Sequence, residues 1–565
     1  PLSVTGGSQR DGSILVKLAG SATADGLRRA YAAPVMQRLA GHFSGGTRFT
    51  GQVLVREHAA QVTVDSSMSG VGMDFPAPLR KAAGDALPVH FSLTTLPSTD
   101  PNVSRDELRL SVGSTMNARY LRSKTGKGPW TVVRGGIGVN NPAPEPDSGV
   151  TLNVSLRTLN VDQWTGLGAA LAGPPSGARG RAADSGPDLA QYVVPDVTAA
   201  RANELVITDR RLDDVVVGAT HAKNVWQASI NARQIEGYLT WNEAPNGAGL
   251  GKVTARLAAL DIPESAAGEV KDLFEGEKGG AVTQIPALDV VADRFVLFNK
   301  ELGRLELLAQ NSLAAAGREW RINKLALDNA DGELDATGRW VNRDGRNTTS
   351  LNFKLGISDA GKLLDRLGFP ETLRRGKGKM EGEVAWNGLP YALDPPSLSG
   401  KISLDVGAGQ FLKKDPGAAK LLGVLSLQML PRLLKLDFHD VFSEGLAFDG
   451  ITANAVINRG VLKTDNLKMH GVAATVLMDG TADIANETTN LHVVVIPEFN
   501  LGTGPLVYAL AVNPVVGLGS FLAQLFLRAP VMKALTYQMQ VTGPWKEPVV
   551  TKLDHNTPAA PSKKE

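Results

Sequence analysis

The segment Gly356–Leu363, GISDAGKL, comes nearest to a known cofactor-binding motif. A phosphate-binding loop needs Ser or Thr directly after its Lys to hold magnesium, and Leu363 occupies that position. The alternative is that a strand ends here and that Ser358 or Asp359 caps a helix by accepting hydrogen bonds from the free N–H groups of its first turn. We therefore predict a capped helix here and no nucleotide site.

Other chemistry-bearing patterns are weaker. The glycine-rich segments that start at Gly135 (GGIGVN) and Gly376 (GKGKMEG) lack the strand–helix context of a phosphate site. The eight histidines are scattered without metal-ligand spacing, and His439, between Asp437 and Asp440, is either a metal ligand or a hydrogen-bonded surface residue. No nucleophile elbow and no local carboxylate-pair signature occur. We predict no catalytic residue, no metal site and no cofactor, so the chain is not expected to be an enzyme.

Amino-acid composition narrows the range of possible functions further. The 565 residues include 59 basic and 57 acidic side chains, and no basic run is interleaved with aromatics, which argues against nucleic acid as a partner. The absence of cysteine excludes disulfides and thiolate metal sites. Sixty-one glycines with 5% aromatic residues favour many turns and slim strands. The chain begins at Pro1 without a leader, so we expect it to be part of a longer protein.

Strict alternation of apolar and polar residues predicts strands with one apolar face. Turn signals such as Asp331-Gly332, Asp449-Gly450, Arg459-Gly460 and Asp479-Gly480 separate them. The predicted fold is mostly β: an elongated, twisted antiparallel sheet curled into an open apolar groove, with few helices. A set of β-sandwiches is the alternative. The expected groove-lining residues are Val150, Leu152, Val154, Leu156, Leu351, Phe353, Leu355, Ile357, Ile402, Leu404 and Val406.

A loose repeat supports an open sheet. Trp320–Trp340 and Val461–Ile484 share one plan, in which a strand ends in a turn and a glycine-containing strand follows. The expected divisions are a groove segment (1–172), a mobile linker rich in Pro, Gly and Ser (173–195), groove repeats (196–400), a C-terminal module with apolar helices (401–554) and a disordered tail (555–565). Further helices are expected at Pro78–Leu87, Val161–Leu171, Glu264–Glu277 and Asp359–Leu373.

The run Phe499–Leu527 contains no charged side chain, and Pro505, Pro514 and several glycines argue against one straight helix. Two short apolar helices are expected, and a further apolar helix begins near Ala418. Buried core helices and a hairpin that touches a membrane remain alternatives. The expected membrane or partner contacts are Leu421, Leu425, Leu506, Val507, Leu510, Phe521, Leu525 and Phe526.

The stretch from Ala419 to Ile484, followed by YALAVNPVVG (Tyr508–Gly517), resembles the C-terminal region of the YhdP family, AsmA-like proteins of Gram-negative bacteria related to TamB. Trp320–Trp340 and Gly356–Gly388 are similar to the same family, so the specific likeness covers about residues 302–553. Upstream, Ser66–Gly84 also looks familial.

The resemblance implies a β-groove open along one side that crosses the periplasm and moves phospholipid toward the outer membrane. It implies an N-terminal inner-membrane anchor, which this sequence does not include, and contact with the inner leaflet of the outer membrane or a protein there. The alternative function is a periplasmic scaffold for assembling outer-membrane proteins through strand pairing. A β-solenoid enzyme acting on envelope polysaccharide would need a carboxylate cluster in a polar cleft, and the apolar alternation speaks against it.

Overall fold

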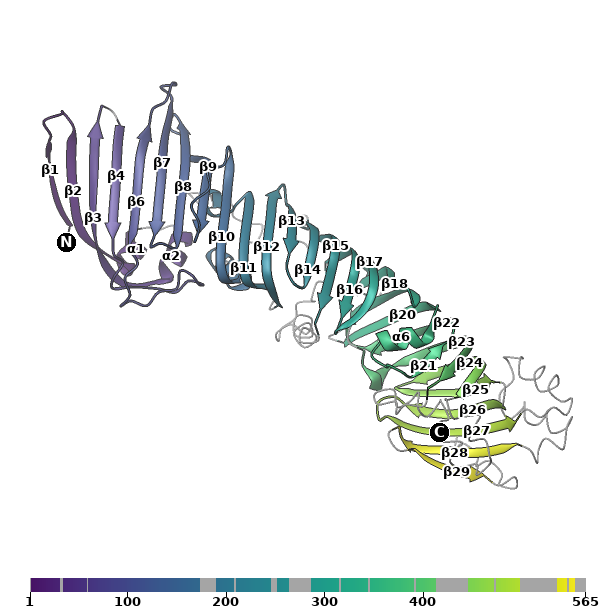
Figure 1. The fold of residues 1–565 in the computed structure, drawn as a ribbon. Helices are drawn as coiled ribbons and strands as arrows, with labels where there is room; N and C mark the ends of the chain where they lie inside the picture. The colour runs from purple at the N-terminus through teal and green to yellow at the C-terminus, as the bar shows by residue number, and fades with distance from the viewer. Residues whose placement is uncertain are drawn as a thin grey trace. The chain divides into compact units, whose positions relative to one another are not determined.

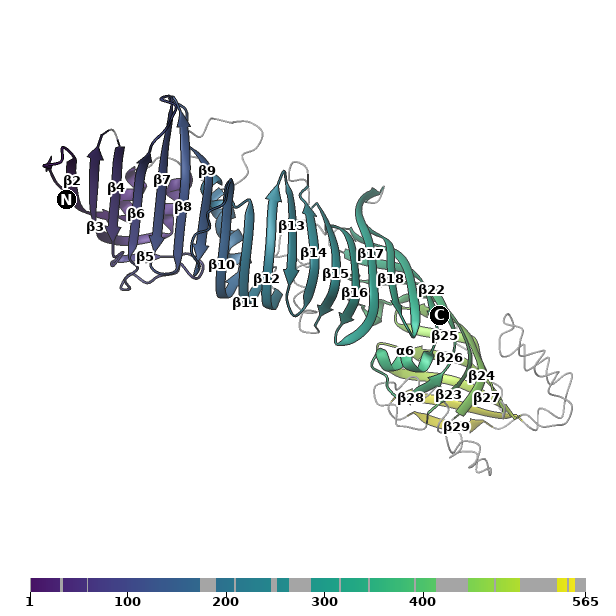
Figure 2. The same cartoon turned by 45° about the horizontal axis from the view of Figure 1, so that its top comes forward.

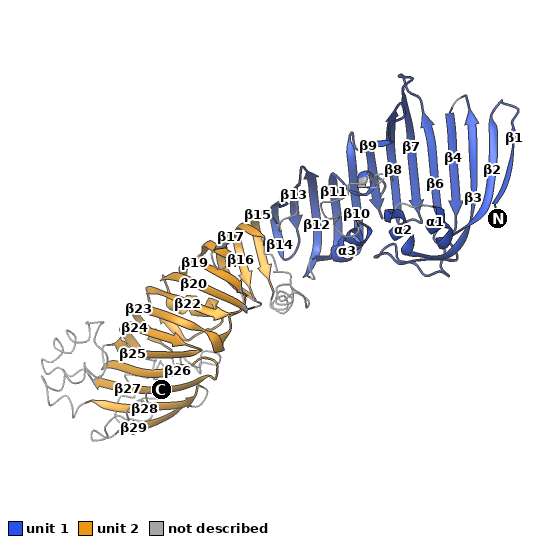
Figure 3. Ribbon diagram, turned by 180° about the vertical axis from the view of Figure 1, so that it is seen from behind, with its two compact units in different colours: residues 1–245 blue, residues 246–565 orange. Residues whose placement is uncertain are grey.

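The computed structural model describes residues 2–30, 34–57, 59–172, 190–207, 210–244, 251–263, 286–314, 317–343, 346–390, 393–412, 446–471, 474–497, 536–545 and 548–553. The chain forms two compact units, unit 1 (Pro1–Pro245) and unit 2 (Asn246–Glu565), which Figure 3 colours separately. The division into segments expected from the sequence stays a prediction.

Unit 1 is a sheet with a few short helices. Its strands are β1 (Leu2–Ser8), β2 (Ile14–Thr23), β3 (Phe43–Arg56), β4 (Ala59–Ser66), β5 (Val71–Met73), β6 (Val89–Leu96), β7 (Val103–Val112), β8 (Met116–Thr125), β9 (Thr131–Val139), β10 (Gly149–Asn160), β11 (Val197–Ile207), β12 (Arg210–Ala222), β13 (Val225–Asn231) and β14 (Ile235–Asn242). Its helices are α1 (Ala24–Ala30), α2 (Pro34–Gly41), α3 (Val161–Ala172) and α4 (Ala190–Val193).

Strands of unit 1 pair with their neighbours in sequence (Figure 1). The pairing is antiparallel from β1 to β9, with β4 bonded to β6 and the short β5 bonded to the start of β3. Strand β10 is parallel to both β9 and β11, and the antiparallel order resumes from β11 to β14. The sheet is therefore mixed, whereas the sequence predicted an antiparallel one.

Glycines explain how β10 can follow β9 in the same direction. The connecting loop runs back along β9, and Pro144 and Asn141 lie where side chains at residues 136 and 138 would stand. An ideal Cβ on Gly136 would be 1.8 Å from the Pro144 carbonyl oxygen, and one on Gly138 would be 2.2 Å from that of Asn141. The GGIGVN segment is thus required by this crossing and not by a phosphate.

Unit 2 is also built from strands. They are β15 (Lys252–Ile262), β16 (Ala287–Leu297), β17 (Lys300–Ala314), β18 (Gly317–Asn329), β19 (Gly332–Arg343), β20 (Arg346–Ile357), β21 (Leu373–Arg375), β22 (Gly378–Asn387), β23 (Ser399–Phe411), β24 (Leu446–Asn458), β25 (Val461–His470), β26 (Ala474–Asp483), β27 (Thr488–Pro497), β28 (Tyr537–Pro544) and β29 (Val549–Leu553). Helix α6 (Ala360–Arg366) and the 3₁₀ turn η2 (Pro395–Ser397) connect them.

In unit 2, β15 and β16 are parallel and every later pairing is antiparallel. Strands β20 and β22 bond directly, while the short β21 bonds to the far end of β23. Figure 2 labels β22 and β23 of this region from a second direction. The described strands of unit 2 belong to one sheet, so the alternative of paired sheets in a sandwich is not what the structure shows.

The two repeat segments are hairpins with the same irregularity. Strands β18 and β19 form one and β25 and β26 form the other. Each has a bulge, after Ile322 in the first and after Thr464 in the second, and each of these residues pairs with a glycine, Gly338 or Gly480. The repeat predicted from sequence is therefore confirmed as a repeated bulged hairpin.

The predicted helices have different outcomes. Residues 161–172 are helical as expected, and Asp359 caps α6 by accepting a hydrogen bond from Lys362 N at 3.1 Å. Helix α6 ends at Arg366, earlier than predicted, because Gly368 has a left-handed φ of 94° and Pro370 follows. Glu264–Glu277 lies outside the described residues.

The helix expected at Pro78–Leu87 is wrong. Lys81 is buried there, and its ammonium donates to the carbonyls of Val71 and Ala82 at 2.7 and 2.9 Å, while its backbone pairs with Met73. These contacts need an extended chain, and they replace the internal hydrogen bonds of a helix. The helices α1 and α2 were not predicted.

Two of the four turn signals are correct. The β18–β19 and β24–β25 turns contain Asp331 and Arg459-Gly460. Asp449-Gly450 and Asp479-Gly480 instead lie inside β24 and β26. Gly480 belongs within a strand because a Cβ there would be 2.2 Å from the Asn490 carbonyl oxygen of β27.

Candidate functional site

Cross-strand rows of apolar side chains are the main surface feature of both units. Successive side chains of a strand point to opposite faces, so residues paired across neighbouring strands form a row on one face. In unit 2, row A passes from β15 to β29 without a charged member. Its residues are Ala255, Val290, Leu307, Leu325, Ala336, Phe353, Gly382, Ile402, Ala455, Thr464, Gly480, Leu491, Val541 and Val550.

The predicted residues of β20 and β23 meet on this face. Phe353 and Ile402 belong to row A and are joined through Gly382 of β22. Three parallel rows, B, C and D, flank row A. Their β20, β22 and β23 members are Leu355, Met380 and Leu404 in row B, Ile357, Gly378 and Val406 in row C, and Leu351, Val384 and Gly400 in row D.

Sequence reasoning missed the β22 members, although a signal was present. Along β22, Met380 and Val384 alternate with Lys379, Glu381 and Glu383. The glycines between them, Gly378 and Gly382, contribute no side chain and so hid the apolar face. A strand whose every second residue is charged is as strong a sign of alternation as one with every second residue apolar.

Unit 1 has an equivalent row, row E, that holds one of the predicted residues. Leu152 of β10 lies in it, and Val154 and Leu156 lie in adjacent rows with Ala200 and Ala202 of β11. Val150 pairs with Gly135 of β9. The members of row E are Val4, Leu18, Gly51, Val64, Phe91, Leu110, Ala118, Ile137, Leu152, Thr198, Ala219, Ala228 and Leu239.

The opposite face of unit 2 is polar. Asp335, Lys354 and Glu381 pair in turn across β19, β20 and β22, which places opposite charges side by side. A hollow of about 1060 Å³ lies over this part of the sheet. Its lining combines charged residues such as Glu381 and Glu383 with the row A residues Phe353 and Ile402, so the lining alone does not assign the hollow to one face. A groove along the apolar face stays a prediction.

Tryptophans border the apolar face on one side. Trp320, Trp340 and Trp386 are buried in one further row, which passes through Thr349. The indole N–H of Trp320 donates to the Pro286 carbonyl at 3.1 Å, and that of Trp386 donates to Leu389 at 3.0 Å. The rings of Trp320 and Trp386 therefore bury their apolar bodies and satisfy their donors, whereas the buried indole N–H of Trp340 has no hydrogen-bond partner among the described residues.

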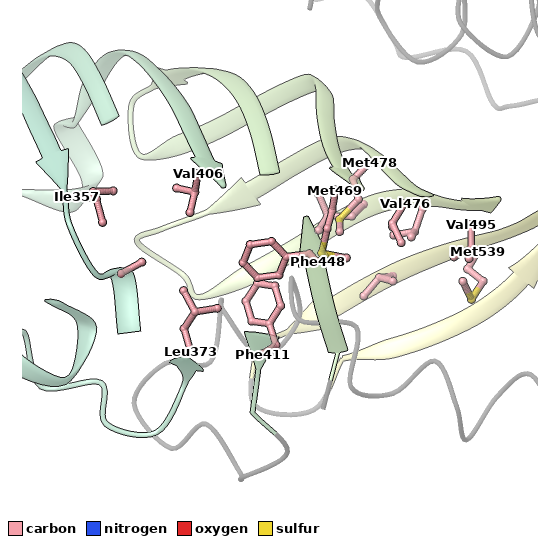
Figure 4. Packing of buried hydrophobic residues seen from close by; sticks show 14 residues of the cluster. Ile357, Leu373, Val406, Phe411, Phe448, Met469, Val476, Met478, Val495 and Met539 are labelled. Carbon is pink, nitrogen blue, oxygen red and sulfur yellow. The ribbon is translucent and has the colours of Figure 1, made fainter. Parts of the chain in front are cut away.

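The apolar face becomes a closed core toward β28. Figure 4 shows this cluster, in which the Phe411 and Phe448 rings lie 5.3 Å apart; Met469 and Met539 belong to the same cluster. Strands β26 and β27 are buried on their other face too, where Leu477 and Val494 are 2% and 0% exposed. Burial on both faces accounts for the continuous apolar runs VLM and VVVI in these strands. Lys468 of β25 is the strand partner of Leu477 of β26. Burial there lowers the pKa of the Lys468 ammonium.

The membrane or partner contacts expected near the C-terminus lie outside the described residues, as does His439. They are Leu421, Leu425, Leu506, Val507, Leu510, Phe521, Leu525 and Phe526. Within the described ranges, no helix is long and apolar enough to cross a membrane. The same ranges contain no group of three or more His, Asp or Glu placed to hold a metal ion.

Comparison with known proteins completes the description. The model of the YhdP protein family matches residues 1–550. Over 501 residues the chain is 25% identical to the intermembrane phospholipid transporter YhdP of Escherichia coli (strain K12), which covers 87% of this chain and 37% of that protein. The chain thus spans well under half the length of this relative. No solved structure matches it.

Proposed function

We propose that this chain, which belongs to the YhdP family, carries phospholipid acyl chains along its apolar face between the inner and outer membranes of the cell envelope. The observation that carries the proposal is row A, which crosses every long strand of unit 2 without a charged side chain. The E. coli relative is described as an intermembrane phospholipid transporter, and this supports the cargo.

The physical need for such a face follows from the cost of exposing acyl chains. Each CH₂ removed from an apolar environment costs about 0.8 kcal/mol, so two chains of roughly sixteen carbons cost on the order of 20 kcal/mol in water. A continuous surface of Leu, Ile, Val and Phe lowers that cost at every point of the path. No reactive group is required for this, so the function is transport and not catalysis.

The finer elements of the proposal come from the sequence and the family. We propose that the whole protein works in the periplasm and is held in the inner membrane by an N-terminal anchor. Leu510 and Leu525 belong to the residues proposed to meet the inner leaflet of the outer membrane or a protein there. Replacing both with Asp is expected to abolish activity in cells while the strands stay folded, and unchanged activity would contradict this contact.

Photo-crosslinking in living cells tests the cargo. A photoreactive residue in place of Leu404, a half-buried member of row B, is expected to capture phospholipid. The matched control is Ser403, the preceding residue on the opposite face of β23, which is expected to capture none. Capture of protein alone, or equal capture at both positions, would contradict transport and favour a scaffold for outer-membrane proteins.

A further inference from the structure

Charged residues interrupt the apolar face of strands β1 to β9 at one place. Among the described strands from β1 to β9, the positions on this face carry a charge only at Asp106, Arg122 and Lys124. Asp106 pairs with Arg122 across β7 and β8, and Lys124 follows two residues later on the same side of β8. The three residues therefore lie together at one end of these strands, beyond the apolar Leu108 and Leu110.

The Arg122 guanidinium makes three hydrogen bonds within the protein. It donates to both carboxylate oxygens of Asp106, at 2.8 and 2.7 Å, and to the Tyr192 hydroxyl of α4 at 3.0 Å. Asp106 is only 4% exposed, so this pair is buried and neutralises itself. The Tyr120 hydroxyl donates to the Tyr192 carbonyl at 2.6 Å, and burial raises the pKa of Tyr120 to about 12, so it keeps its proton.

Lys124 is different, because no carboxylate of the described residues lies within ion-pair distance of its ammonium. Its Nζ lies 5.5 Å from the centre of the Trp130 ring, and the Arg122 guanidinium lies 5.0 Å from the same ring. Both Lys124 and Trp130 are half-buried. The cluster therefore carries one uncompensated positive charge beside an accessible aromatic ring.

The order of residue types along β8 matches the order across half of a bilayer. Ala118 is buried in the apolar face, Tyr120 follows, and Lys124 stands outermost, near the ring of Trp130, which directly precedes β9. In membranes, aromatic rings and lysines gather where acyl chains give way to phosphates, because both have an apolar body and a polar end. Lys124 lies about 13 Å beyond Tyr120 at the usual rise of a strand.

We propose that Lys124 and Trp130 bind the phosphodiester head group of a phospholipid whose acyl chains lie on the apolar face of unit 1. The ammonium donates to a phosphate oxygen, and the indole packs against the glycerol part of the head group. Arg122 stays paired with Asp106. This assignment rests on the function proposed above and specifies where on the chain the head group is recognised.

Two photoreactive phosphatidylglycerols test it on the purified chain, one with a diazirine on the head group and one with a diazirine at the end of an acyl chain. With Lys124→Glu, head-group capture is expected to fall about tenfold, the effect of losing one charge-assisted hydrogen bond, while acyl-chain capture stays. Trp130→Ala is expected to act in the same direction. Lys127→Glu makes the same change of charge three residues away, at an exposed position, and is expected to have no effect.

The outcomes separate the two proposals. Equal head-group capture by the Lys124→Glu and Lys127→Glu variants would overturn the head-group site while acyl-chain capture upholds transport. If excess inorganic phosphate abolishes head-group capture, Lys124 binds a free anion and not a lipid head group, and this result also overturns the assignment. Absence of capture of either lipid by the unmodified chain would count against the transport function itself.

Discussion

The ring of Tyr120 on β8 occupies the space that a side chain on residue 135 of β9 would fill: an ideal Cβ on Gly135 would be 2.4 Å from Tyr120 Cδ1. This contact presses the ring against the sheet and aligns its hydroxyl with the Tyr192 carbonyl of α4. The absence of a side chain at residue 135 thus fixes how α4 meets the apolar face.

We expect Gly135→Val to destabilise unit 1 by about 1–3 kcal/mol, because overpacking forces the Tyr120 ring out of its position. Thermal unfolding measures the loss. Gly218→Ala on β12 is the control, since nothing lies within 4 Å of an ideal Cβ there. Equal unfolding temperatures for the two variants would show that the Tyr120 ring moves aside without cost.

A charge on the apolar face is expected to stop transport without unfolding the chain. Leu355→Asp places a carboxylate in row B, where passing acyl chains would have to lie against a charge that has no partner. Asn352→Asp puts the same group on the polar face of the same strand and should leave activity unchanged. Growth of cells that depend on the full-length protein measures the difference, and comparable growth of both variants would contradict a lipid path along row B.

Asp359 is expected to stabilise α6 and to have no role with nucleotides. Asp359→Ala removes the acceptor of the Lys362 N–H and should cost about 0.5–2 kcal/mol in the free energy of unfolding. Ser358→Ala is the matched control, because the backbone N–H of Ser358 donates to the Asp331 carbonyl while its hydroxyl makes no hydrogen bond to another described residue. Chemical unfolding of the two variants tests the cap; the reverse order of stability would mean that Ser358 is the cap.

Stability is expected to depend on pH through His492. Its Nδ1 lies 3.0 Å from a carboxylate oxygen of Asp479, and this hydrogen bond raises the pKa of His492 above its ordinary 6.5. Because the pKa of His492 is higher in the folded state than in the unfolded state, its protonation stabilises the fold, and this contribution is complete below a pH of about 6.5. The contribution is lost as the pH rises through the pKa of the folded state. The unfolding temperature of the wild type should therefore fall, relative to His492→Gln, between mildly acidic and mildly alkaline pH.

Asp479→Asn provides the second arm of that measurement. Removing the carboxylate should flatten the same part of the pH profile, since the protonated imidazole then has no charged partner. Calorimetry at a series of pH values follows all three proteins, and groups that titrate identically in each cancel in the comparison. A wild-type profile that runs parallel to both variants would show that His492 contributes nothing to the pH dependence.

Period-two alternation allowed the apolar face to be predicted from sequence. Because a shift of one residue would turn every side chain to the other face, Phe353 and Ile402 could be assigned to the same face before the pairing through Gly382 was known. Membership of the YhdP family was also predicted from the sequence, from local motifs, and it is confirmed. The lipid contacts themselves stay predictions.

Features that depend on distant contacts could not be predicted. The parallel course of β10 rests on Pro144 crossing Gly136, and the burial of Lys81 rests on the carbonyl of Val71. Neither relationship leaves a periodic signal. The ion pair between Asp106 and Arg122 joins residues 16 positions apart, and each alone looks like a surface charge in its strand. Three-dimensional pairing is what turns them into a buried pair.

Pairing of each strand with its neighbour in sequence also has a consequence for how the chain folds. Most hydrogen bonds close short loops, so the entropy lost at each step is small and the sheet can grow strand by strand from any formed hairpin. Growth must pause where β11 joins β10, because residues 161–196 intervene before the parallel partner is reached. Time-resolved hydrogen exchange should therefore show two folding fronts in unit 1, one that ends at β10 and one that starts at β11, with the β10–β11 pairing formed last.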